Sequence, residues 1–360
     1  MNICIVTGAR PNFVKIAPLV RAFRANGAIT FQTVYAGRED DPTLEPTLFD
    51  DLQMPRPNIF LGVSSQSLNE ITAQVMGAFD RYLDTCPADV VIVVDDLAST
   101  MAATITAKKR GIKVAHLVAG TRSFDMSMPK EVNRLVIDAL SDYLFTAGIK
   151  SSSVATRGQQ SETAQTYMVG NILIDSLRYN MPRFTPPDAF PCKADSYIVL
   201  TINRRALLAD EANLEKMLQT IVETTGDAPI IAPLRDRVLG TTVRLLTRLR
   251  VPSRKFSIIS PLPYLEFGWL TAHAKGVITD SGNVAEEATF TGVPCITLNS
   301  YAEHEETVTA GTNVLVGGDA AKLGSALAQL MAGKWKKSAL PDRWDGRTAE
   351  RIVQVLTQNG

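Results

Sequence analysis

Short apolar runs alternate with amphipathic stretches along most of the chain. In the first half the runs have the length and β-branched content of buried strands, and they cover residues 2–7, 29–35, 89–94, 113–118 and 142–146. Helical periodicity fills the intervals, over residues 13–25, 67–83, 98–110 and 131–140. Strands that alternate with helices in this way predict a doubly wound parallel sheet. Residues 37–66 contain four prolines and are predicted to form a functional or lid-like loop rather than a core element.

A second alternating series begins after a proline-rich stretch. The prolines that define this stretch are Pro182, Pro186, Pro187 and Pro191, and they indicate a linker over residues 182–193. Beyond it, strands are predicted over 196–201, 228–232, 256–259, 276–279 and 294–298, and helices over 211–224, 237–249, 262–273 and 284–291. The sequence therefore predicts two α/β domains, residues 1–181 and 194–342, with a ligand in the cleft at the carboxyl ends of both sheets. A C-terminal helix over residues 343–360 can pack back on the first domain.

Composition and charge narrow the class of protein. Lys and Arg number 37, and Asp and Glu also number 37, so no net charge favours nucleic acid or an anionic membrane as a partner. No apolar run reaches the length of a membrane span, and the sequence opens on a strand rather than on a signal peptide. The four cysteines are scattered without metal-ligand spacing, which favours a reducing cytoplasm. We expect neither a metal site nor a cofactor.

The turn after the predicted strand 276–279 carries candidate chemistry. Ser281, Gly282 and Asn283 lead into a helix, whose first N–H groups and positive dipole end favour a phosphate. Gly282 permits close approach of an anion, and Ser281 adds a hydroxyl donor. Glu286 and Glu287 lie in the first helical turn, where they can accept hydrogen bonds from a sugar diol. The alternative is an ordinary strand-to-helix connection with Ser281 as its cap.

Other charged or polar residues follow predicted strands in both halves. They are Arg10, Lys15, Asp95, Asp96 and the segment 119–131 in the first half, and Asn203, Arg204, Arg205, Arg235, Arg237 and the loop 301–307 in the second. Several arginines that face a helix N-terminus suit the two negative groups of a pyrophosphate. A single arginine in such a place is more often solvated or paired with a nearby acid. Taken together, the set favours an anionic ligand.

Short segments along nearly the whole chain resemble those of a known family and occur in the same order as in that family. They are Gly8-Ala-Arg-Pro-Asn-Phe-Val-Lys-Ile-Ala-Pro-Leu19, Ser99-Thr100, Val114-Ala-His116, Ala119-Gly120, Arg122-Ser123, Glu131-Val-Asn-Arg134, Val169-Gly-Asn171, Pro261-Leu262, Tyr264-Leu265, Thr279-Asp-Ser-Gly282, Glu286-Glu287 and Thr312-Asn-Val-Leu315. The chain resembles the non-hydrolysing UDP-N-acetylglucosamine 2-epimerases. The resemblance implies the GT-B fold, two Rossmann-like domains that close over a nucleotide sugar.

The resemblance also implies roles for individual residues. Arg10, Lys15, Ser281 and Gly282 match positions that meet the diphosphate, and Glu287 matches the position that holds the ribose. The further ligand-binding residues expected from the matching segments and turns are His116, Arg122, Arg134, Arg204, Arg235 and Asn283. UDP or a UDP-sugar is therefore the expected ligand. We expect the chain to act as a homodimer or to pair with a paralogue.

The acid–base positions of the family do not match. Where the family has Gly-Asp, this chain has Asp95-Asp96, and the glutamate of His-Val-Glu-Ala-Gly is replaced by Val118. Lys130 stands in place of the first glutamate of Pro-Glu-Glu, while Glu131 retains the second. Two histidines of the second domain are replaced as well, by Asn203 and Arg235.

These replacements bear on the reaction that the resemblance implies, which eliminates UDP by removing a proton from C2 and then adds it back on the other face. Both steps need groups that exchange protons near neutral pH. Valine exchanges none, asparagine does not titrate, and lysine reverses the charge. Asp95, Asp96, Lys130, Glu131 and Asn203 form the candidate catalytic set.

Three hypotheses follow. The first is a UDP-sugar-binding member of the family with altered chemistry, in which ordinary 2-epimerase activity is weak or absent. The second is a catalytically silent paralogue that serves as a binding or partner subunit. The third is a glycosyl or related group transferase that uses the same cleavage of the C1–O bond.

Overall fold

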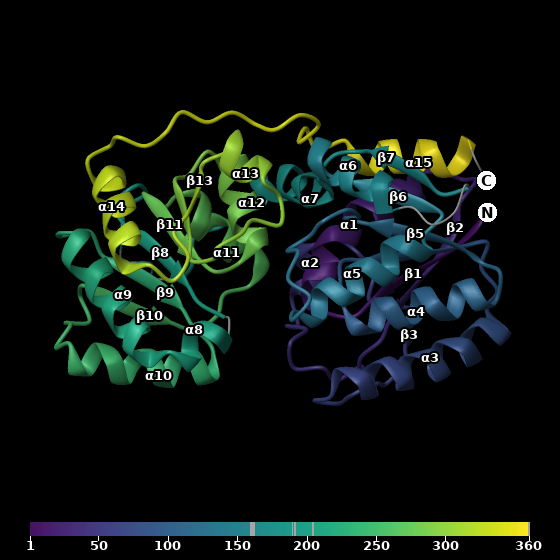
Figure 1. Ribbon diagram of the computed structural model, residues 1–360, viewed down its shortest axis with the longest axis horizontal. Coiled ribbons are helices and arrows are strands. Elements are labelled where there is room, and N and C mark those ends of the chain that lie inside the picture. The colour runs from purple at the N-terminus through teal and green to yellow at the C-terminus, as the bar shows by residue number, and fades with distance from the viewer. Residues whose placement is uncertain (159–162, 189, 191, 204, 359–360) are drawn as a thin grey trace. The chain divides into compact units, whose positions relative to one another are not determined.

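The computed structural model of the chain describes residues 1–158, 163–188, 190, 192–203 and 205–358 (Figure 1). They fold into two compact units. Unit 1 comprises Met1–Tyr179 together with Asp342–Gly360, and unit 2 comprises Asn180–Pro341. Each unit is built on one parallel sheet, so the predicted α/β fold class is confirmed. Within the described part of the chain, no helix is long and apolar enough to cross a bilayer.

The sheet of unit 1 has seven parallel strands in the order β3-β2-β1-β4-β5-β6-β7. The strands are β1 (Asn2–Thr7), β2 (Thr30–Tyr35), β3 (Ile59–Phe60), β4 (Val90–Val94), β5 (Lys113–Leu117), β6 (Tyr143–Thr146) and β7 (Gln165–Met168). The order reverses at β1, which pairs with β2 on one side and with β4 on the other. Ligands of such sheets bind at the carboxyl ends of the strands, where the order reverses.

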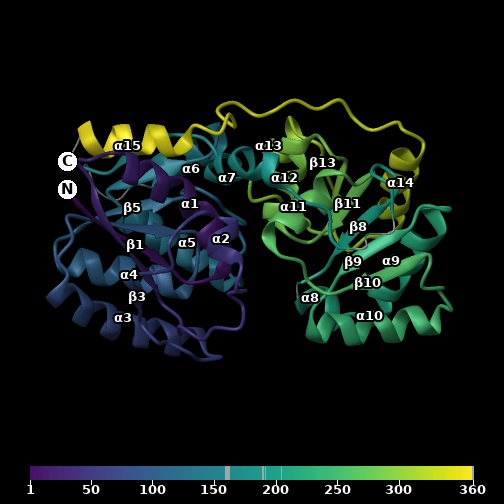
Figure 2. The same cartoon turned by 180° about the vertical axis from the view of Figure 1, so that it is seen from behind.

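Helices cover both faces of this sheet (Figures 1 and 2). They are α1 (Arg10–Ala25), α2 (Leu48–Asp51), α3 (Leu68–Thr85), α4 (Ala98–Lys109), α5 (Pro129–Leu140), α6 (Ile149–Gly158), α7 (Ile172–Asn180) and α15 (Thr348–Gln358). The yellow helix α15, from the end of the chain, packs on α1. Every residue of β4 is buried, as its continuous apolar sequence requires for a central strand covered on both faces.

Trp344 anchors the segment that returns to unit 1. Its side chain is 1% exposed, and its ring N–H donates to the carbonyl of Ala147 over 3.1 Å. The carboxylate of Asp175 then accepts the backbone N–H groups of Thr348 and Ala349, over 3.1 and 2.8 Å. Because these bonds satisfy the first donors of the helix, α15 begins at Thr348 rather than at residue 343.

Unit 2 contains a six-stranded parallel sheet in the order β10-β9-β8-β11-β12-β13. The strands are β8 (Ile198–Thr201), β9 (Ile230–Pro233), β10 (Phe256–Ile259), β11 (Gly276–Thr279), β12 (Cys295–Thr297) and β13 (Asn313–Leu315). The helices are η1 (Met181–Arg183), α8 (Arg205–Ala209), α9 (Glu211–Thr224), α10 (Asp236–Arg248), α11 (Tyr264–Ala272), α12 (Gly282–Thr291), α13 (Glu306–Thr309) and α14 (Ala320–Met331). The order reverses beside β8, as it does beside β1 in unit 1.

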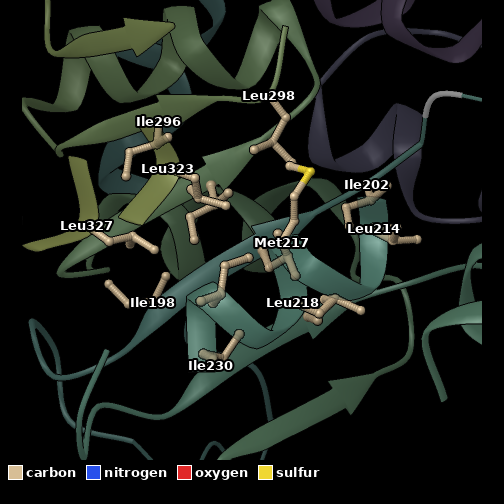
Figure 3. Close-up of a cluster of buried hydrophobic side chains, with 14 of the residues drawn as sticks. Ile198, Ile202, Leu214, Met217, Leu218, Ile230, Ile296, Leu298, Leu323 and Leu327 are labelled. Atoms are coloured by element: carbon tan, nitrogen blue, oxygen red, sulfur yellow. The ribbon is translucent and has the colours of Figure 1, made fainter. Parts of the chain in front are cut away.

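The larger core of unit 2 lies between its sheet and helices α9 and α14 (Figure 3). Leu214, Leu218 and Ile221 recur at helical spacing and form the buried stripe of α9. They pack with apolar side chains of the sheet such as Ile198 and Ile230, all of them 0–1% exposed. This packing fixes β8 and β9, whose carboxyl ends carry residues predicted for the site.

The segment 37–66 differs from its prediction as a loop, because it contains α2 and adds β3 to the sheet edge. Leu48 is fully buried, and the ring of Phe49 lies 5.1 Å from that of Phe13 in α1. The prolines of this segment lie outside both elements, so α2 forms between the second and the third proline and β3 follows the last one.

Candidate functional site

In unit 1 the loops that follow β1, β4 and β5 emerge at one edge of the sheet, where the strand order reverses. Lys15 of α1 and Asp95 after β4 form an ion pair there, with 2.6 Å between Nζ and Oδ1. Asn12 donates its amide to the other oxygen of Asp95 over 2.8 Å, and its own oxygen accepts two backbone N–H groups that precede the helix. Because of these two bonds α1 begins at Arg10 rather than at residue 13. Asn12 therefore lies inside the helix, from where its side chain accepts hydrogen bonds from the preceding turn, and it is not the N-cap residue.

Arg10, at the start of α1, is held by Glu45 from the loop that follows β2. The Nε of Arg10 lies 2.8 and 2.7 Å from the two carboxylate oxygens, and its Nη2 contacts Oε1 as well. The side chains are 22% and 20% exposed. A guanidinium and a carboxylate thus form a forked pair at the edge where the anionic ligand is expected.

His116, Asp138 and Arg122 form a buried triad. In the imidazole ring, Nδ1 lies 2.6 Å from Asp138 Oδ1 and Nε2 lies 3.0 Å from the carbonyl oxygen of Asp95. Because both nitrogens face oxygen acceptors, the doubly protonated ring satisfies both contacts. The other oxygen of Asp138 lies 2.6 Å from Arg122 Nη1 and accepts the N–H of Gly120 over 3.1 Å.

The environment of Asp138 sets its ionisation. Burial raises the pKa of this carboxyl, but the positive charges of His116 and Arg122 and the hydrogen bonds they donate outweigh burial, so the pKa lies below its ordinary value. Asp138 therefore stays negative near neutral pH and holds both cations in place.

Asp96 and Glu131 share Arg134 between them. Arg134 directs Nε and Nη2 to one oxygen of Asp96, over 2.8 and 2.6 Å, and its Nη1 lies 3.4 Å from Glu131. Lys130 Nζ lies 3.1 Å from the other oxygen of Asp96. Glu131 also accepts the backbone N–H and the hydroxyl of Ser123, over 2.8 and 2.9 Å.

These contacts join the predicted first-half residues into one set, which we call the ion-pair network. Its members are Lys15, Asp95, Asp96, His116, Arg122, Lys130, Glu131, Arg134 and Asp138. With His116 doubly protonated, the cationic groups outnumber the carboxylates. Arg134 and Glu131 are each 1% exposed as residues, whereas the side chain of Lys130 is 53% exposed and presents its charge at the rim.

Val118, directly after β5, has a strained backbone. Its φ is +72°, a left-handed conformation in which a β-branched residue is a rare outlier. Gly120 follows with φ +78°, and a Cβ on it would lie 2.0 Å from the carbonyl oxygen of Ser151 in α6. The turn therefore already lies against α6 and has no room to shift toward it. Asp95, at the matching end of β4, has φ +59°. Strain of this kind persists where the surrounding structure dictates it, and it is most frequent at functional sites.

In unit 2 the turn after β11 lies next to the end of β8, because these two strands pair. Asp280 is 2% exposed and accepts the backbone N–H of Asn203 over 2.7 Å. Its own carbonyl accepts the side-chain amide of Asn299 over 3.1 Å. Asp280 therefore ties the end of β8, the turn after β11 and the loop after β12 together.

Helix α12 begins at Gly282, earlier than the predicted residue 284, with Ser281 at the N-cap position. Ser281 therefore stands where the alternative interpretation places it, at the cap, but its hydroxyl makes no capping hydrogen bond to an N–H group that the structure describes. The carboxylate of Glu303 lies against the first residue of the helix, 3.0 Å from where a Cβ on Gly282 would stand. This N-terminus thus already has a negative group beside it.

The other residues predicted for the site in the second half differ from one another in burial and in their contacts. Glu287 is half-buried in α12, while Glu286 is 2% exposed and lies 3.9 Å from His304 Nε2. Asn203 is exposed, as is Arg235 at the N-cap of α10, and Asn283 is half-buried in α12. Arg204 lies outside the described residues.

Sequence reasoning missed Asp138 and Glu45, and it included Glu303 only as part of the loop 301–307. Asp138 had a usable signal, because Glu131, Arg134 and Asp138 recur at helical spacing and fall on the buried face of α5. Glu45 had none, since it lies in a loop and its contact depends on how that loop folds.

The strand orders of the two sheets reverse in the same way, and polar groups gather at each reversal. These features define the class of α/β proteins with two Rossmann-like units. Comparison with known proteins narrows this class. A family model described as UDP-N-acetylglucosamine 2-epimerase matches residues 21–357. The UDP-N-acetylglucosamine 2-epimerase of Methanocaldococcus jannaschii is 32% identical, over 99% of both chains. The UDP-2,3-diacetamido-2,3-dideoxy-D-glucuronate 2-epimerase of Pseudomonas aeruginosa is 31% identical, over 88% of both chains.

A solved structure agrees with these relatives. The crystal structure of the M. jannaschii UDP-GlcNAc 2-epimerase, in complex with UDP-GlcNAc and UDP, superimposes with a TM-score of 0.88, at 31% identity and over 100% of both chains. The chain belongs to the UDP-N-acetylglucosamine 2-epimerase family. Its fold is GT-B, as the resemblance implied.

Proposed function

We propose that this chain binds a UDP-sugar and that its chemistry at the sugar differs from ordinary 2-epimerisation. Binding is supported by family membership and by the similar M. jannaschii enzyme, whose structure holds UDP-GlcNAc and UDP. Arg10, Lys15 and the Ser281-Gly282 turn are the proposed diphosphate contacts, with Glu287 on the ribose. His116, Arg122, Arg134, Arg204, Arg235 and Asn283 are the proposed supporting residues.

The observation that carries the altered chemistry is the pairing of every carboxylate in the ion-pair network. Asp95 pairs with Lys15, Asp96 with Lys130 and Arg134, Glu131 with Arg134, and Asp138 with His116 and Arg122. A carboxylate whose oxygens are engaged by cations is not free to take a proton from the sugar without breaking those contacts. Val118 brings no proton-exchanging group to the network. Ordinary 2-epimerase activity is therefore expected to be weak or absent.

The test is incubation of the full chain with UDP-N-acetylglucosamine in deuterated water, followed by mass spectrometry and NMR. We expect UDP-sugar binding by calorimetry without deuterium at C2. Deuterium at C2 would contradict altered chemistry, and absence of any UDP binding would contradict the proposal as a whole. Binding without any reaction favours the silent paralogue. Release of UDP only when an acceptor is added favours the transferase.

A second candidate concerns the sugar itself, and Lys130 favours it. A half-exposed lysine replaces a family glutamate at the rim of the ion-pair network and supplies the positive charge by which its cations outnumber its carboxylates. Such a rim suits a sugar that bears a carboxylate, and a relative at 31% identity is named for a glucuronate substrate. UDP-glucuronic acid should then bind more tightly than UDP-glucose, and Lys130→Glu should reverse that order. Equal affinities in the wild type would rule this candidate out.

Assembly and compartment belong to the same proposal. Phe124, Met126, Val132 and Leu135 expose apolar side chains on α5 and the loop before it, by 72, 62, 41 and 39%. An exposed apolar patch of this kind supports a homodimer or a pair with a paralogue, which light scattering of the purified chain would reveal. The four free cysteines fit a reducing cytoplasm.

A further inference from the structure

We propose that Glu45 in unit 1 and Glu303 in unit 2 are built-in competitors that occupy the phosphate-binding groups until the nucleotide displaces them. This inference rests on the proposed function, and it adds a means by which the site controls its own occupancy. Each carboxylate lies on a loop outside the ion-pair network, and each sits on a group that the sequence predicts to meet a diphosphate.

In unit 1 the competitor is a forked carboxylate on Arg10. Glu45 engages Nε of Arg10 with both oxygens, over 2.8 and 2.7 Å, and Nη2 with one of them. A phosphate would use the same donors of the guanidinium in the same forked geometry. Arg10 therefore cannot bind Glu45 in this way and a phosphate at the same time.

In unit 2 the competitor is a carboxylate at the start of α12. One oxygen of Glu303 lies 3.0 Å from where a Cβ on Gly282 would stand, and its carboxyl carbon lies 3.4 Å away. The first turn of a ten-residue helix attracts anions through its N–H groups and dipole. The absence of a side chain on Gly282 leaves room for one negative group there, and the carboxylate of Glu303 lies beside that space.

The two contacts have a common consequence. At Arg10 a phosphate gains its contact only after it breaks a contact of the same kind, and beside Gly282 it must displace a carboxylate, so the observed affinity is the difference between gain and loss. A weakly bound anion gains less free energy from its new contacts than it loses by breaking the existing ones. A diphosphate gains more, and at each binding group it releases the loop whose carboxylate it replaces.

The test is calorimetric titration of UDP into the full chain and into Glu45→Gln. The amide keeps the size of the side chain but loses its charge, so UDP should bind roughly three- to tenfold more tightly. Glu39→Gln is the matched control, because it removes one exposed negative charge from the same loop without a contact to Arg10 among the described residues. This control should leave the affinity unchanged. Uridine, which lacks phosphate, should bind wild type and Glu45→Gln equally.

A double-mutant cycle tests the mechanism. In an Arg10→Ala background, Glu45→Gln should no longer tighten UDP binding, because the group for which carboxylate and phosphate compete is gone. Glu303→Gln should tighten UDP binding independently, so that the two gains multiply in the double variant.

The outcomes separate this inference from the proposed function. If the wild type binds no UDP, the proposed function fails. If the wild type binds UDP and Glu45→Gln binds it with equal affinity, the competitor role is overturned while the proposed function stands. Weaker binding by Glu45→Gln also overturns it, because Glu45 would then hold Arg10 in position for the ligand.

Discussion

His116 and Asp138 are joined by a contact of 2.6 Å between Nδ1 and Oδ1, and both side chains are almost fully buried. The pair links β5 to α5, and through the second imidazole nitrogen it reaches the backbone of Asp95 after β4. One carboxylate thus orients the elements on which the ion-pair network is built. Its charge is needed for that, because the same carboxylate pairs with both His116 and Arg122.

Loss of this charge should destabilise unit 1 in a pH-dependent manner. Because the pKa of folded Asp138 lies below the unfolded value of 3.8, its contribution is present above that value and disappears as pH falls through the folded pKa. Asp138→Asn should lower the free energy of unfolding by about 3 kcal/mol at pH 7, and the difference should shrink below pH 3.8. Fluorescence of Trp344 reports unit 1 if Trp269 and Trp335 are both changed to Phe. A difference that does not depend on pH would contradict this account.

The backbone of Val118 should reverse the usual ranking of Gly and Ala. At most positions a variant with Gly has a lower free energy of unfolding than one with Ala. At φ +72°, however, Gly has no Cβ and so avoids the steric cost that Ala bears. We expect Val118→Gly to be more stable than Val118→Ala by about 1 kcal/mol in urea unfolding. The same two substitutions at Val132, exposed on α5, should show the ordinary order. If Ala is the more stable residue at both positions, the turn is not held in the left-handed conformation.

Arg10→Ala should weaken UDP binding by about 1.5–3 kcal/mol, the size of a lost hydrogen bond to a charged group. Arg38→Ala serves as its control, because Arg38 is exposed and pairs with Asp40 in the loop that also carries Glu45. Calorimetry should find UDP affinity unchanged in the control. Unchanged affinity in Arg10→Ala would remove this residue from the site.

Restoring the family-type groups should raise epimerase activity. The combined variant Val118→Glu, Lys130→Glu and Asn203→His returns two carboxylates and one imidazole, which together can take a proton from one face of C2 and deliver it to the other. Interconversion of the C2 epimers of UDP-N-acetylglucosamine, followed by NMR, should be faster than in the wild type. If the wild type matches or exceeds this variant, the proposed loss of acid–base chemistry is wrong. Circular dichroism of the variant checks that it is folded.

The sequence was sufficient to predict the central strands, because each is a continuous apolar run that only a sheet covered on both faces can bury. It did not reveal β7, a partly buried four-residue strand that begins with two polar residues, or β13, which is three residues long and has a buried asparagine. Both strands lie at sheet edges. At an edge the neighbouring strand supplies much of the stabilisation, and apolar periodicity therefore carries less information.

The candidate site was predictable to a similar degree. Residues in the turns after strands, such as Arg10, Asp96 and Ser281, could be placed because parallel strands all end at one edge. Their partners could not be placed, because Glu45 reaches Arg10 from 35 positions away and Glu303 reaches Gly282 through a loop. The electrostatic state of the site depends on these partners and so could not be read from the sequence.

The return of Asp342–Gly360 to unit 1 has a consequence for how the protein folds during its synthesis on the ribosome. Unit 2 is one uninterrupted segment, so it can mature as soon as Pro341 has left the exit tunnel. Most of unit 1 emerges before unit 2, yet Trp344 and the helix that packs on α1 are translated after unit 2. The nascent first unit must therefore wait with an uncovered apolar face while the second is made. Folding along the growing chain is completed in the reverse of the order in which the units are translated.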